Sequence, residues 1–470
     1  MRIAIDMQGT QTGSGIRGIG RYTLSITKAI IKKSNGRHEI IIVLNGLFPD
    51  TIEPLKKEFK TLLSEDSIKI WYAPCPVNYM DAENDFRRKA AELMREAFFE
   101  SLKPDIIWIP SLFEGSYDNA VTSIGAFDKR TPVAVTVHDL IPMMFQDFYL
   151  NHNPRLKGHY FEKIKFLKKA SYWLAVSEYT AKEAVRMLEM DESRIAVTYE
   201  GFDPVFGKRN ISIEEESAIK AKFGIKKDFL LHVGIVVDSR KNIDTLLKAF
   251  SMLPNELRSG LQLVLTGGNP DFVMSSVKAA AKDVGVEENK LIFTGYVSDE
   301  NLMFLYNICD LFIFPSWCEG FGLPPLEAMA CGAPVLVANA TSLPEVVGNS
   351  DALFDPFSVD SISERINRVL TDENFRNELS FKGFEQAKKF SWEESAKITI
   401  KAFENIEKFE NISKSSKNNK NEQENVTNNI VDDLINSIGS IIGSKDMDYE
   451  LLKELSLCIF KNFYEYKILS

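Results

Sequence analysis

Two glutamates, Glu319 and Glu327, are separated by the seven residues Gly-Phe-Gly-Leu-Pro-Pro-Leu. The apolar run Leu311–Phe314 before them predicts a buried strand, and Pro324 and Pro325 predict the first turn of a helix. A loop between a buried strand and a helix points into the ligand crevice at the carboxyl ends of a parallel sheet. Because an ionised carboxylate accepts hydrogen bonds through two oxygens, the pair could hold two separate groups of sugar hydroxyls.

The residues between the two glutamates suit a bound anion. Glycines let the backbone approach a ligand closely, and the free amides at a helix N-terminus suit a phosphate. The candidate ligand-binding residues of this loop are Gly320, Phe321, Gly322 and Leu323. A purely structural alternative places Glu327 in the first helical turn, where it complements the helix dipole, and makes Glu319 a solvated loop residue.

Arg240 and Lys241 stand next to each other just before the predicted helix Ile243–Met252. Two cations at a helix N-terminus oppose the helix dipole unless they reach outwards to an anion. A bound diphosphate therefore explains this pair better than helix stability does.

A third motif, with Gly13, Gly15 and Gly18 in the spacing G-x-G-x-x-G, follows a predicted first strand. This spacing raises the hypothesis of a dinucleotide site. Two features argue against it: the first glycine lies several residues beyond the strand, and the second strand, Glu39–Leu44, leads into Asn45 where a ribose-binding acid is expected. A glycine-rich loop whose backbone meets a substrate phosphate is the preferred interpretation.

His138 follows the predicted strand Ala134–Val137 and precedes Asp139. One interpretation is a histidine held by hydrogen bonds at a strand end. The other is a functional histidine at the carboxyl edge of the sheet.

Together these motifs closely resemble those of the family-4 retaining glycosyltransferases of the GT-B fold, over roughly residues 1 to 405. The wording Arg-Gly-Ile-Gly-Arg-Tyr of the glycine loop is similar to that of bacterial polysaccharide and O-antigen mannosyltransferases in particular. The resemblance implies transfer of a hexose from a nucleoside diphosphate sugar to a hydroxyl of a growing glycan or lipid-linked glycan, with the anomeric configuration retained. It favours GDP-mannose as the donor, and uridine donors stay open.

The resemblance also implies roles for individual residues. His138 and Glu319 would contact the transferred sugar, and Glu327 would contact the donor ribose. The remaining candidates would contact the donor phosphates and base. They are Gly15, Gly18, Arg240, Lys241, Tyr296, Val297, Gly320, Phe321, Gly322 and Leu323. Arg240, Lys241 and helix amides can stabilise the leaving diphosphate without a metal, so neither a metal nor a cofactor is expected. The chain departs from many relatives at Ile235, where they carry an arginine.

Two rival functions follow from the same fold. A nucleotide-sugar epimerase would need extra acid and base groups in the crevice, and the two-glutamate motif fits it less well. An inactive binding or scaffold domain would have lost some of these side chains, yet both glutamates, both cations and His138 are present.

Composition excludes other classes of protein. The formal charge of −10 argues against nucleic acid as a partner. The five cysteines show no metal-ligand spacing and predict reduced thiols in the cytoplasm. A charge at the second residue argues against a signal peptide, and no apolar run approaches ~18 residues, so the prediction is a cytoplasmic protein, either free or peripheral on the inner face of the membrane.

Alternation of predicted strands and helices indicates an α/β protein with two Rossmann-like, doubly wound domains that face each other across a cleft. The first is predicted to span 1–206, with a helix at 391–410 packing back on it, and the second, which binds the donor, 217–390. Residues 411–429 are rich in Asn, Lys, Ser, Glu and Gln and predict a disordered linker. Residues 430–470 predict an amphipathic helical tail that contacts a membrane surface or a protein.

Overall fold

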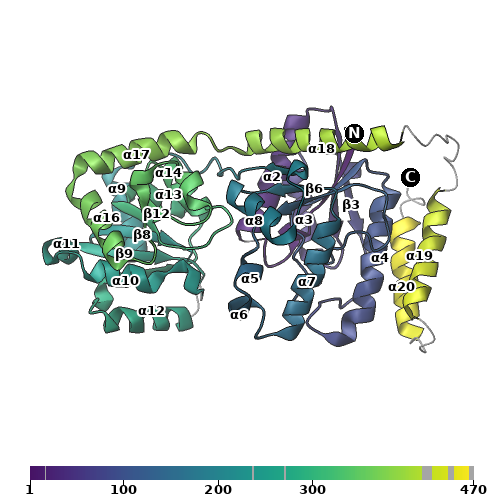
Figure 1. Ribbon diagram of the computed structural model, residues 1–470, viewed down its shortest axis with the longest axis horizontal. Helices are drawn as coiled ribbons and strands as arrows, with labels where there is room; N and C mark the ends of the chain where they lie inside the picture. Colours follow the sequence, from purple (N-terminus) through teal and green to yellow (C-terminus); the bar gives the residue numbers. More distant parts are fainter. Residues whose placement is uncertain (16, 235–237, 269–270, 415–425, 443–448, 465–470) are drawn as a thin grey trace. The chain divides into compact units, whose positions relative to one another are not determined.

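The computed structural model divides the chain into two compact units (Figure 1). It describes residues 1–15, 17–234, 238–268, 271–414, 426–442 and 449–464. Unit 1 comprises Met1–Val176, Ala181–Thr198 and Trp392–Ser470, and unit 2 comprises Ser177–Thr180 and Tyr199–Ser391.

The boundary after Thr198 lies earlier than the predicted end of the first domain at residue 206. Aromatic packing explains this correction. The ring of Tyr199 lies 5.4 Å from that of Phe390, and the ring of Phe206 lies 5.9 Å from that of Tyr306. All four rings belong to unit 2, so the segment after residue 198 is part of the second core.

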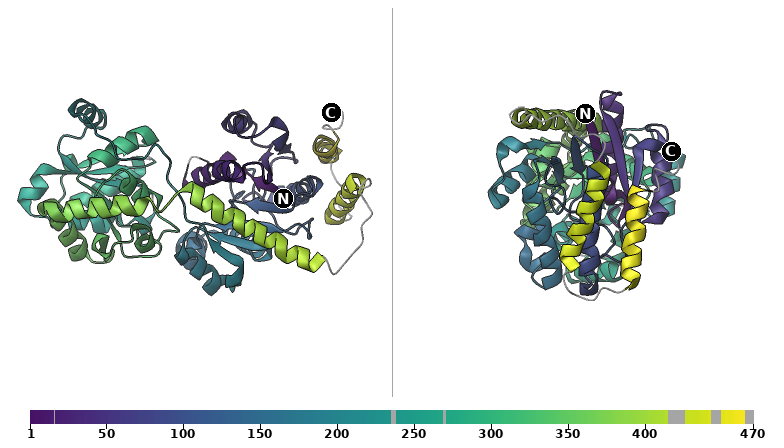
Figure 2. Two further views of the ribbon diagram at one scale, coloured as in Figure 1. Left: turned by 90° about the horizontal axis from the view of Figure 1, so that it is seen from above. Right: turned by 90° about the vertical axis from the view of Figure 1, so that its right-hand side faces the viewer.

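Unit 1 is built on a seven-stranded parallel sheet with the strand order β3-β2-β1-β4-β5-β6-β7. Its strands are β1 (Arg2–Asp6), β2 (Glu39–Asn45), β3 (Ile68–Trp71), β4 (Ile106–Ile109), β5 (Val133–Val137), β6 (Tyr172–Ala175) and β7 (Ile195–Val197). Every residue of β4 and β5 is buried, as expected for a parallel sheet with helices on both faces (Figure 2).

The helices that belong wholly or mainly to unit 1 are α1 (Gln8–Gln11), α2 (Gly18–Ser34), α3 (Pro49–Phe59), α4 (Asp85–Ser101), α5 (Ile141–Met144), α6 (Gln146–Tyr149), α7 (Pro154–Lys169), α8 (Glu178–Leu188), α18 (Trp392–Lys414), α19 (Val426–Ile442) and α20 (Tyr449–Phe463). Helix α18, predicted at 391–410, packs along α2 within this unit.

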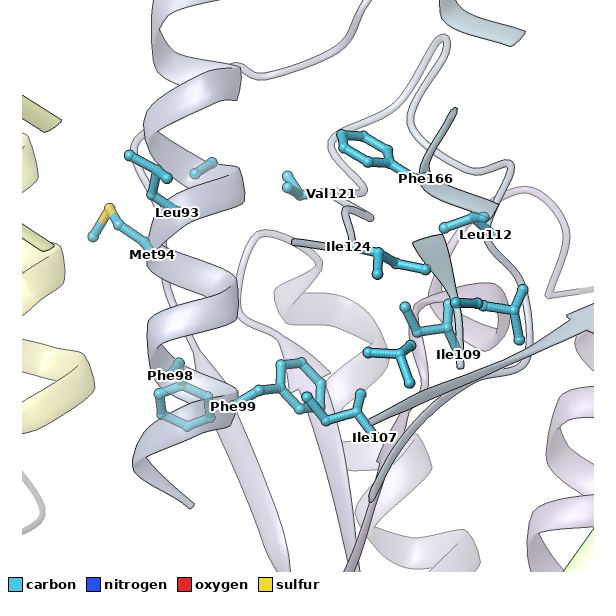
Figure 3. Packing of buried hydrophobic residues seen from close by; sticks show 14 of the residues in the cluster. Leu93, Met94, Phe98, Phe99, Ile107, Ile109, Leu112, Val121, Ile124 and Phe166 are labelled. Carbon is cyan, nitrogen blue, oxygen red and sulfur yellow. The ribbon is translucent and has the colours of Figure 1, made fainter. Parts of the chain in front are cut away.

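The core of unit 1 lies between α4 and the sheet (Figure 3). Phe99 of α4 points towards Ile107 of β4, whereas Met94 points the other way, towards the two C-terminal helices. Helix α4 is therefore buried on two sides.

The C-terminal helices α19 and α20 fold onto unit 1 beside α4 (Figure 1). The side chains that they bury there are Ile430, Val431, Leu434, Ile438, Leu455, Cys458 and Phe463. Asn462 of α20 accepts a hydrogen bond from the Tyr72 amide at 2.7 Å and donates one to the Tyr72 carbonyl at 2.8 Å, just beyond the edge strand β3. The predicted tail is thus part of the first domain, although Leu457 and Phe460 stay about half exposed.

Both ends of the segment predicted as a linker, 411–429, are helical in the structure. Helix α18 runs to Lys414 and α19 begins at Val426, while residues 415–425 lie outside the described part of the chain. Lys, Glu and Gln are good helix formers, so a helix that already exists continues into such a segment.

Unit 2 carries a six-stranded parallel sheet with the order β10-β9-β8-β11-β12-β13. Its strands are β8 (Asp228–Val233), β9 (Leu261–Thr266), β10 (Leu291–Gly295), β11 (Leu311–Phe314), β12 (Val335–Ala338) and β13 (Leu353–Phe354). Its helices are α9 (Ile213–Phe223), α10 (Ile243–Ser251), α11 (Asn255–Gly260), α12 (Asp271–Asp283), α13 (Asp299–Ile308), α14 (Leu323–Ala330), α15 (Leu343–Val347), α16 (Val359–Thr371) and α17 (Glu373–Ala387).

Among the described residues, no helix has both the length and the apolar character needed to cross a lipid bilayer.

Candidate active site

Each sheet reverses its strand order once near its centre, and the predicted site residues follow these strands. In unit 1 the reversal lies between β1 and β4, and in unit 2 between β8 and β11. In open α/β sheets the crevice for ligands forms beyond the carboxyl ends of the strands at this reversal. The glycine loop follows β1, Arg240 and Lys241 follow β8, and Glu319 follows β11.

The structure brings Glu319 together with both predicted cations. Its carboxylate oxygens lie 2.7 Å from Nη1 of Arg240 and 2.7 Å from Nζ of Lys241. Asp238 accepts a further hydrogen bond from Nε of Arg240 at 2.7 Å. The four side chains are mostly buried, with exposed fractions of 11–19%, and carry two positive and two negative formal charges. In this structure the cations reach the anions of the protein itself.

The charges of this cluster shift the pKa values of its members in opposite directions. Burial alone would raise the pKa of Glu319, but Lys241 and Arg240, together with the Lys241 and Ser316 hydrogen bonds, lower it to about 2. Burial alone would lower the pKa of Arg240, but Glu319 and Asp238 raise it above its usual range. Glu319 and Arg240 are therefore ionised at neutral pH.

Local backbone structure holds the two cations at this place. Ser239–Lys241 form a single 3-10 turn, whose amide at Arg240 donates to the Asp238 carboxylate at 3.0 Å. Asn242 then adopts the left-handed region, with φ of 59°. Its side-chain amide donates to the carbonyls of Pro315, at 3.2 Å, and Pro356, at 2.7 Å, and so ties this turn to the loop after β11.

The loop residues 320–323 contribute backbone more than side chains. The Phe321 ring is buried, 6.2 Å from the Tyr199 ring, so it belongs to the core of unit 2. Gly322 has φ of 139°, and a Cβ there would lie 2.9 Å from the Leu343 side chain. Leu323 is the first residue of α14. The positive φ together with this close approach therefore already favours a glycine at position 322.

Glu327 is placed differently from the prediction. Helix α14 begins at Leu323, so Glu327 is its fifth residue and not part of a first turn that faces solvent. Its side chain is almost fully buried and accepts a hydrogen bond from the Tyr306 hydroxyl at 3.1 Å. The interpretation of Glu327 as a dipole-complementing first-turn acid is wrong, because Glu327 lies beyond the first turn of α14 and is buried.

The two residues predicted beside the donor base follow β10. Tyr296 is 77% exposed, whereas Val297 is buried. Tyr296 therefore presents an accessible aromatic ring, and Val297 packs into the unit. Ile235, the position of the departure from many relatives, lies outside the described residues.

The glycine loop of unit 1 is tightly packed. A Cβ on Gly15 would lie 2.5 Å from the Thr10 carbonyl oxygen, and one on Gly20 would lie 2.3 Å from the Gly15 Cα. Gly18 is the first residue of α2. Asn45 is fully buried and donates to Gln8 at 2.8 Å, so no ribose-binding acid stands at the end of β2.

Glu114, which none of the sequence motifs includes, organises this loop. Its buried carboxylate accepts hydrogen bonds from the hydroxyls of Ser111 (2.7 Å), Thr12 (2.9 Å) and Ser14 (3.2 Å). Burial raises the pKa of Glu114, although these hydroxyls oppose the change. The available signal was a carboxylate five residues beyond a fully buried strand, in the loop Ser-Leu-Phe-Glu-Gly-Ser.

His138 lies in the same part of unit 1. Its Nε2 atom lies 2.9 Å from the Pro110 carbonyl oxygen, and its ring lies 4.8 Å from the Tyr22 ring in a T-shaped contact. Because a carbonyl only accepts, Nε2 carries the proton, and Nδ1 is the acceptor atom of the neutral ring.

Comparison with known proteins gives these loops a context. Residues 16–206 match the family model described as "Glycosyltransferase Family 4", and residues 214–386 match "Glycosyl transferases group 1". The chain is 37% identical over 404 residues to the "Serotype-specific mannosyltransferase WbdA" of Escherichia coli, which covers 86% of this chain and 48% of that protein. It is 36% identical over 273 residues to the "O-antigen chain mannosyltransferase B" of Escherichia coli, covering 57% of this chain and 69% of that protein. The chain thus spans about half the length of the WbdA relatives.

Solved structures agree on the fold. Anabaena Alr3699/HepE in complex with UDP and glucose aligns with a TM-score of 0.62 at 18% identity, over 86% of this chain and all of that one. WaaG, described as a glycosyltransferase involved in lipopolysaccharide biosynthesis, aligns with a TM-score of 0.59 at 16% identity, over 86% of this chain and 99% of that one. From the two family matches, the relatives and the two doubly wound sheets, the chain belongs to the family-4, group 1 glycosyltransferases and has the GT-B fold.

Proposed function

We propose that this chain transfers mannose from GDP-mannose to a hydroxyl of a growing bacterial surface polysaccharide such as O-antigen, with the anomeric configuration retained. The observation that carries the proposal is the 37% identity over 86% of the chain to a protein described as a serotype-specific mannosyltransferase. The second relative, described as an O-antigen chain mannosyltransferase, supports the same sugar and the same type of acceptor.

The charged cluster of unit 2 suits the donor diphosphate. Among the described residues, Nη2 of Arg240 makes no hydrogen bond, and Nζ of Lys241 makes one, to Glu319. Both cations therefore keep N–H groups for a phosphate while they hold the carboxylate. Positive charge placed beforehand where the diphosphate leaves stabilises the transition state, and this proposal uses no metal ion.

Glu319 has two tasks in this proposal. Its carboxylate holds Arg240 and Lys241 in place, and it accepts hydrogen bonds from hydroxyls of the donor sugar. The low pKa of Glu319 keeps it ionised and unable to act as a general acid at neutral pH. We assign no enzymic nucleophile. Arg240 and Lys241 act on the leaving group, while His138 contacts the transferred sugar.

The donor is a nucleotide sugar from the cytoplasm, and the acceptor is a glycan carried on a lipid at the inner face of the membrane. In this proposal the exposed face of α20, with Leu457 and Phe460, remains the surface for a membrane or protein contact.

The test is nucleoside diphosphate release from GDP-mannose, UDP-glucose, UDP-N-acetylglucosamine and dTDP-rhamnose, with and without a short mannose-ended acceptor. The expected result is acceptor-dependent release of nucleoside diphosphate from GDP-mannose. The linkage of the product, determined by NMR, should have the same anomeric configuration as the donor. Glu319→Gln and Arg240→Ala should each abolish this release, whereas Thr399→Val, which removes a buried hydroxyl without a hydrogen-bond partner, should not.

Other outcomes would replace the proposal. Acceptor-dependent release from a uridine donor alone would overturn the assignment of mannose. Conversion of the donor to an epimer would indicate an epimerase, and donor binding without turnover would indicate a binding domain.

A further inference from the structure

The backbone of Glu319–Phe321 is held by four side-chain hydroxyls, those of Ser177, Thr180, Thr341 and Ser342, which we call the hydroxyl cage. Ser177 and Thr180 place their hydroxyls 2.7 Å and 3.2 Å from the Gly320 carbonyl oxygen. Their side chains are fully buried, and all the residues of the cage belong to unit 2. The peptide that follows Glu319 is therefore fixed from a segment more than 100 residues earlier in the chain.

The other two hydroxyls come from the turn before α15. Thr341 Oγ1 accepts a hydrogen bond from the Glu319 amide at 3.0 Å. Ser342 Oγ, also buried, lies 3.0 Å from the Glu319 carbonyl oxygen and 2.5 Å from that of Phe321. The Glu319 amide is thus paired with Thr341, and the two carbonyls share the single O–H donor of Ser342.

The backbone conformation of Thr341 indicates that this arrangement has a functional role. Thr341 has φ of 50°, in the left-handed region that a β-branched residue rarely adopts. Such a conformation persists only where the surrounding contacts demand it, and it concentrates at functional sites. Here it directs the Thr341 hydroxyl to the Glu319 amide.

Glu345 fixes the segment that carries the first two hydroxyls. Its carboxylate accepts hydrogen bonds from the backbone amides of Glu178, at 2.9 Å, and Tyr179, at 3.0 Å, and from the hydroxyl of Tyr199, at 3.1 Å. Glu345 lies in the first turn of α15, but its carboxylate bonds to the amides of Glu178 and Tyr179, which belong to the same unit. Glu345 therefore acts on the cage through Ser177 and Thr180.

We propose that Ser177, Thr180 and Glu345 are positioning residues for sugar transfer: they set the orientation of the Glu319–Gly320 peptide, so that the Glu319 carboxylate meets Lys241 and Arg240 and presents its oxygens to the donor sugar. This inference rests on the proposed function. The cations themselves lie on the 3-10 turn after β8, where Asp238 and the Cys318 carbonyl also hold Arg240. Loss of the cage should therefore affect catalysis more than donor binding.

The first measurement is kinetic. The double variant Ser177→Ala/Thr180→Val removes both hydroxyls from the Gly320 carbonyl, and a displaced Glu319 should lower kcat about 10- to 100-fold. The donor KM should stay within about threefold, because Asp238 and the Cys318 carbonyl still hold Arg240 when Glu319 is displaced. Thr180→Ser keeps a hydroxyl and should restore most of the kcat that Thr180→Val loses. Glu345→Gln should lower kcat in the same direction.

The second measurement does not depend on turnover. Hydrogen exchange of the peptide that covers residues 316–323 should become faster in the double variant and in Glu345→Gln, because the amides of this loop lose their fixed geometry. Thr399→Val is the matched control, since it also removes a buried threonine hydroxyl, and it should change neither the exchange of this peptide nor kcat.

The two measurements separate the two proposals. A native chain that releases no nucleoside diphosphate contradicts the proposed function. Faster hydrogen exchange in the variants would still show that the cage fixes the loop at residues 316–323. If the native chain turns over and the variants are unchanged in kcat and in hydrogen exchange, the proposed positioning role of the cage is overturned. An equal rise in donor KM and fall in kcat/KM at constant kcat would also overturn it, because it would show a role in donor binding.

Discussion

The Glu319 carboxylate lies 2.7 Å from the Lys241 ammonium nitrogen, although the two residues follow different strands of the second sheet. Arg240 joins the same carboxylate at 2.7 Å. The Glu319 carboxylate, with one oxygen on each cation, therefore links the loop after β11 to the turn after β8. The following predictions test what this link and its neighbours contribute.

The link should make stability depend on pH in the acid range. The pKa of Glu319 falls from 4.5 to about 2 in the folded protein, so its stabilising effect is complete above about 4.5 and is lost as pH falls towards 2. The free energy of unfolding of the native chain should exceed that of Glu319→Gln by on the order of 3 kcal/mol at pH 7. Urea unfolding at several pH values checks this, and a difference that stays constant between pH 6 and pH 3 would contradict the prediction.

Arg240 should not be replaceable by lysine. Its guanidinium bonds Asp238, Glu319 and the Cys318 carbonyl at once, whereas an ammonium on a flexible stem cannot reproduce this planar fork. Arg240→Lys should raise the donor KM about tenfold, by the loss of one charge-assisted hydrogen bond. Arg186→Lys, at a side chain in unit 1 that is 64% exposed, is the control and should leave the donor KM unchanged.

Glu114 predicts the opposite dependence of stability on pH. Burial raises the pKa of this carboxyl group above 4.5, so the folded chain binds more protons than the unfolded chain just above that pH, and its stability falls as pH rises. Glu114→Gln removes this dependence. The free energy of unfolding of the variant minus that of the native chain should therefore increase between pH 5 and pH 7.5, and a decrease over this range would refute the assignment.

Glu327 can be tested through the donor. If it holds the donor ribose, Glu327→Gln should raise the KM for GDP-mannose about tenfold or more, as expected for a lost hydrogen bond to a charged group. The same variant should change the KM for a donor that lacks the ribose hydroxyls much less. Tyr306→Phe, which removes the observed partner of Glu327 but keeps the carboxylate, separates loss of the contact from loss of the local structure. Equal effects on both donors would exclude the ribose role.

The C-terminal helices should be essential to the first domain. Leu434 of α19 is fully buried, so Leu434→Ala should lower the free energy of unfolding by about 2–5 kcal/mol. Leu457→Ala, at a side chain that is 54% exposed, should change it by less than about 0.5 kcal/mol. Chemical denaturation measures both, and a near-zero effect at Leu434 would show that the helices are only loosely attached.

Much of the fold could be predicted because its strands are continuous apolar runs. Leu311–Phe314, for instance, is a strand with the predicted bounds and is buried on both faces. Parallel strands covered by helices produce this pattern, and sequence shows it directly. The loops that follow the strands at the reversal of order could likewise be identified as candidate sites.

Contacts between distant loops could not be predicted. Nothing in the sequence around Arg240 indicates that its anion is the Glu319 carboxylate, 79 positions away, because this pairing depends on which two strands become neighbours. Glu114 is similar, since its three hydroxyl partners lie on two separate loops. The burial of Glu327 depends on where α14 begins, and helix ends are the least certain part of any sequence-based assignment.

The hydrogen bonds between Asn462 and Tyr72 have a consequence for the chain in solution. The edge of a parallel sheet exposes unpaired amides and carbonyls, which are a template for strands from other molecules. A side-chain amide reproduces the donor and acceptor of a peptide group, so Asn462 occupies the position that a foreign strand would need first. Helix α20 in this way occupies the polar backbone groups of Tyr72 that a strand from another molecule would otherwise pair with.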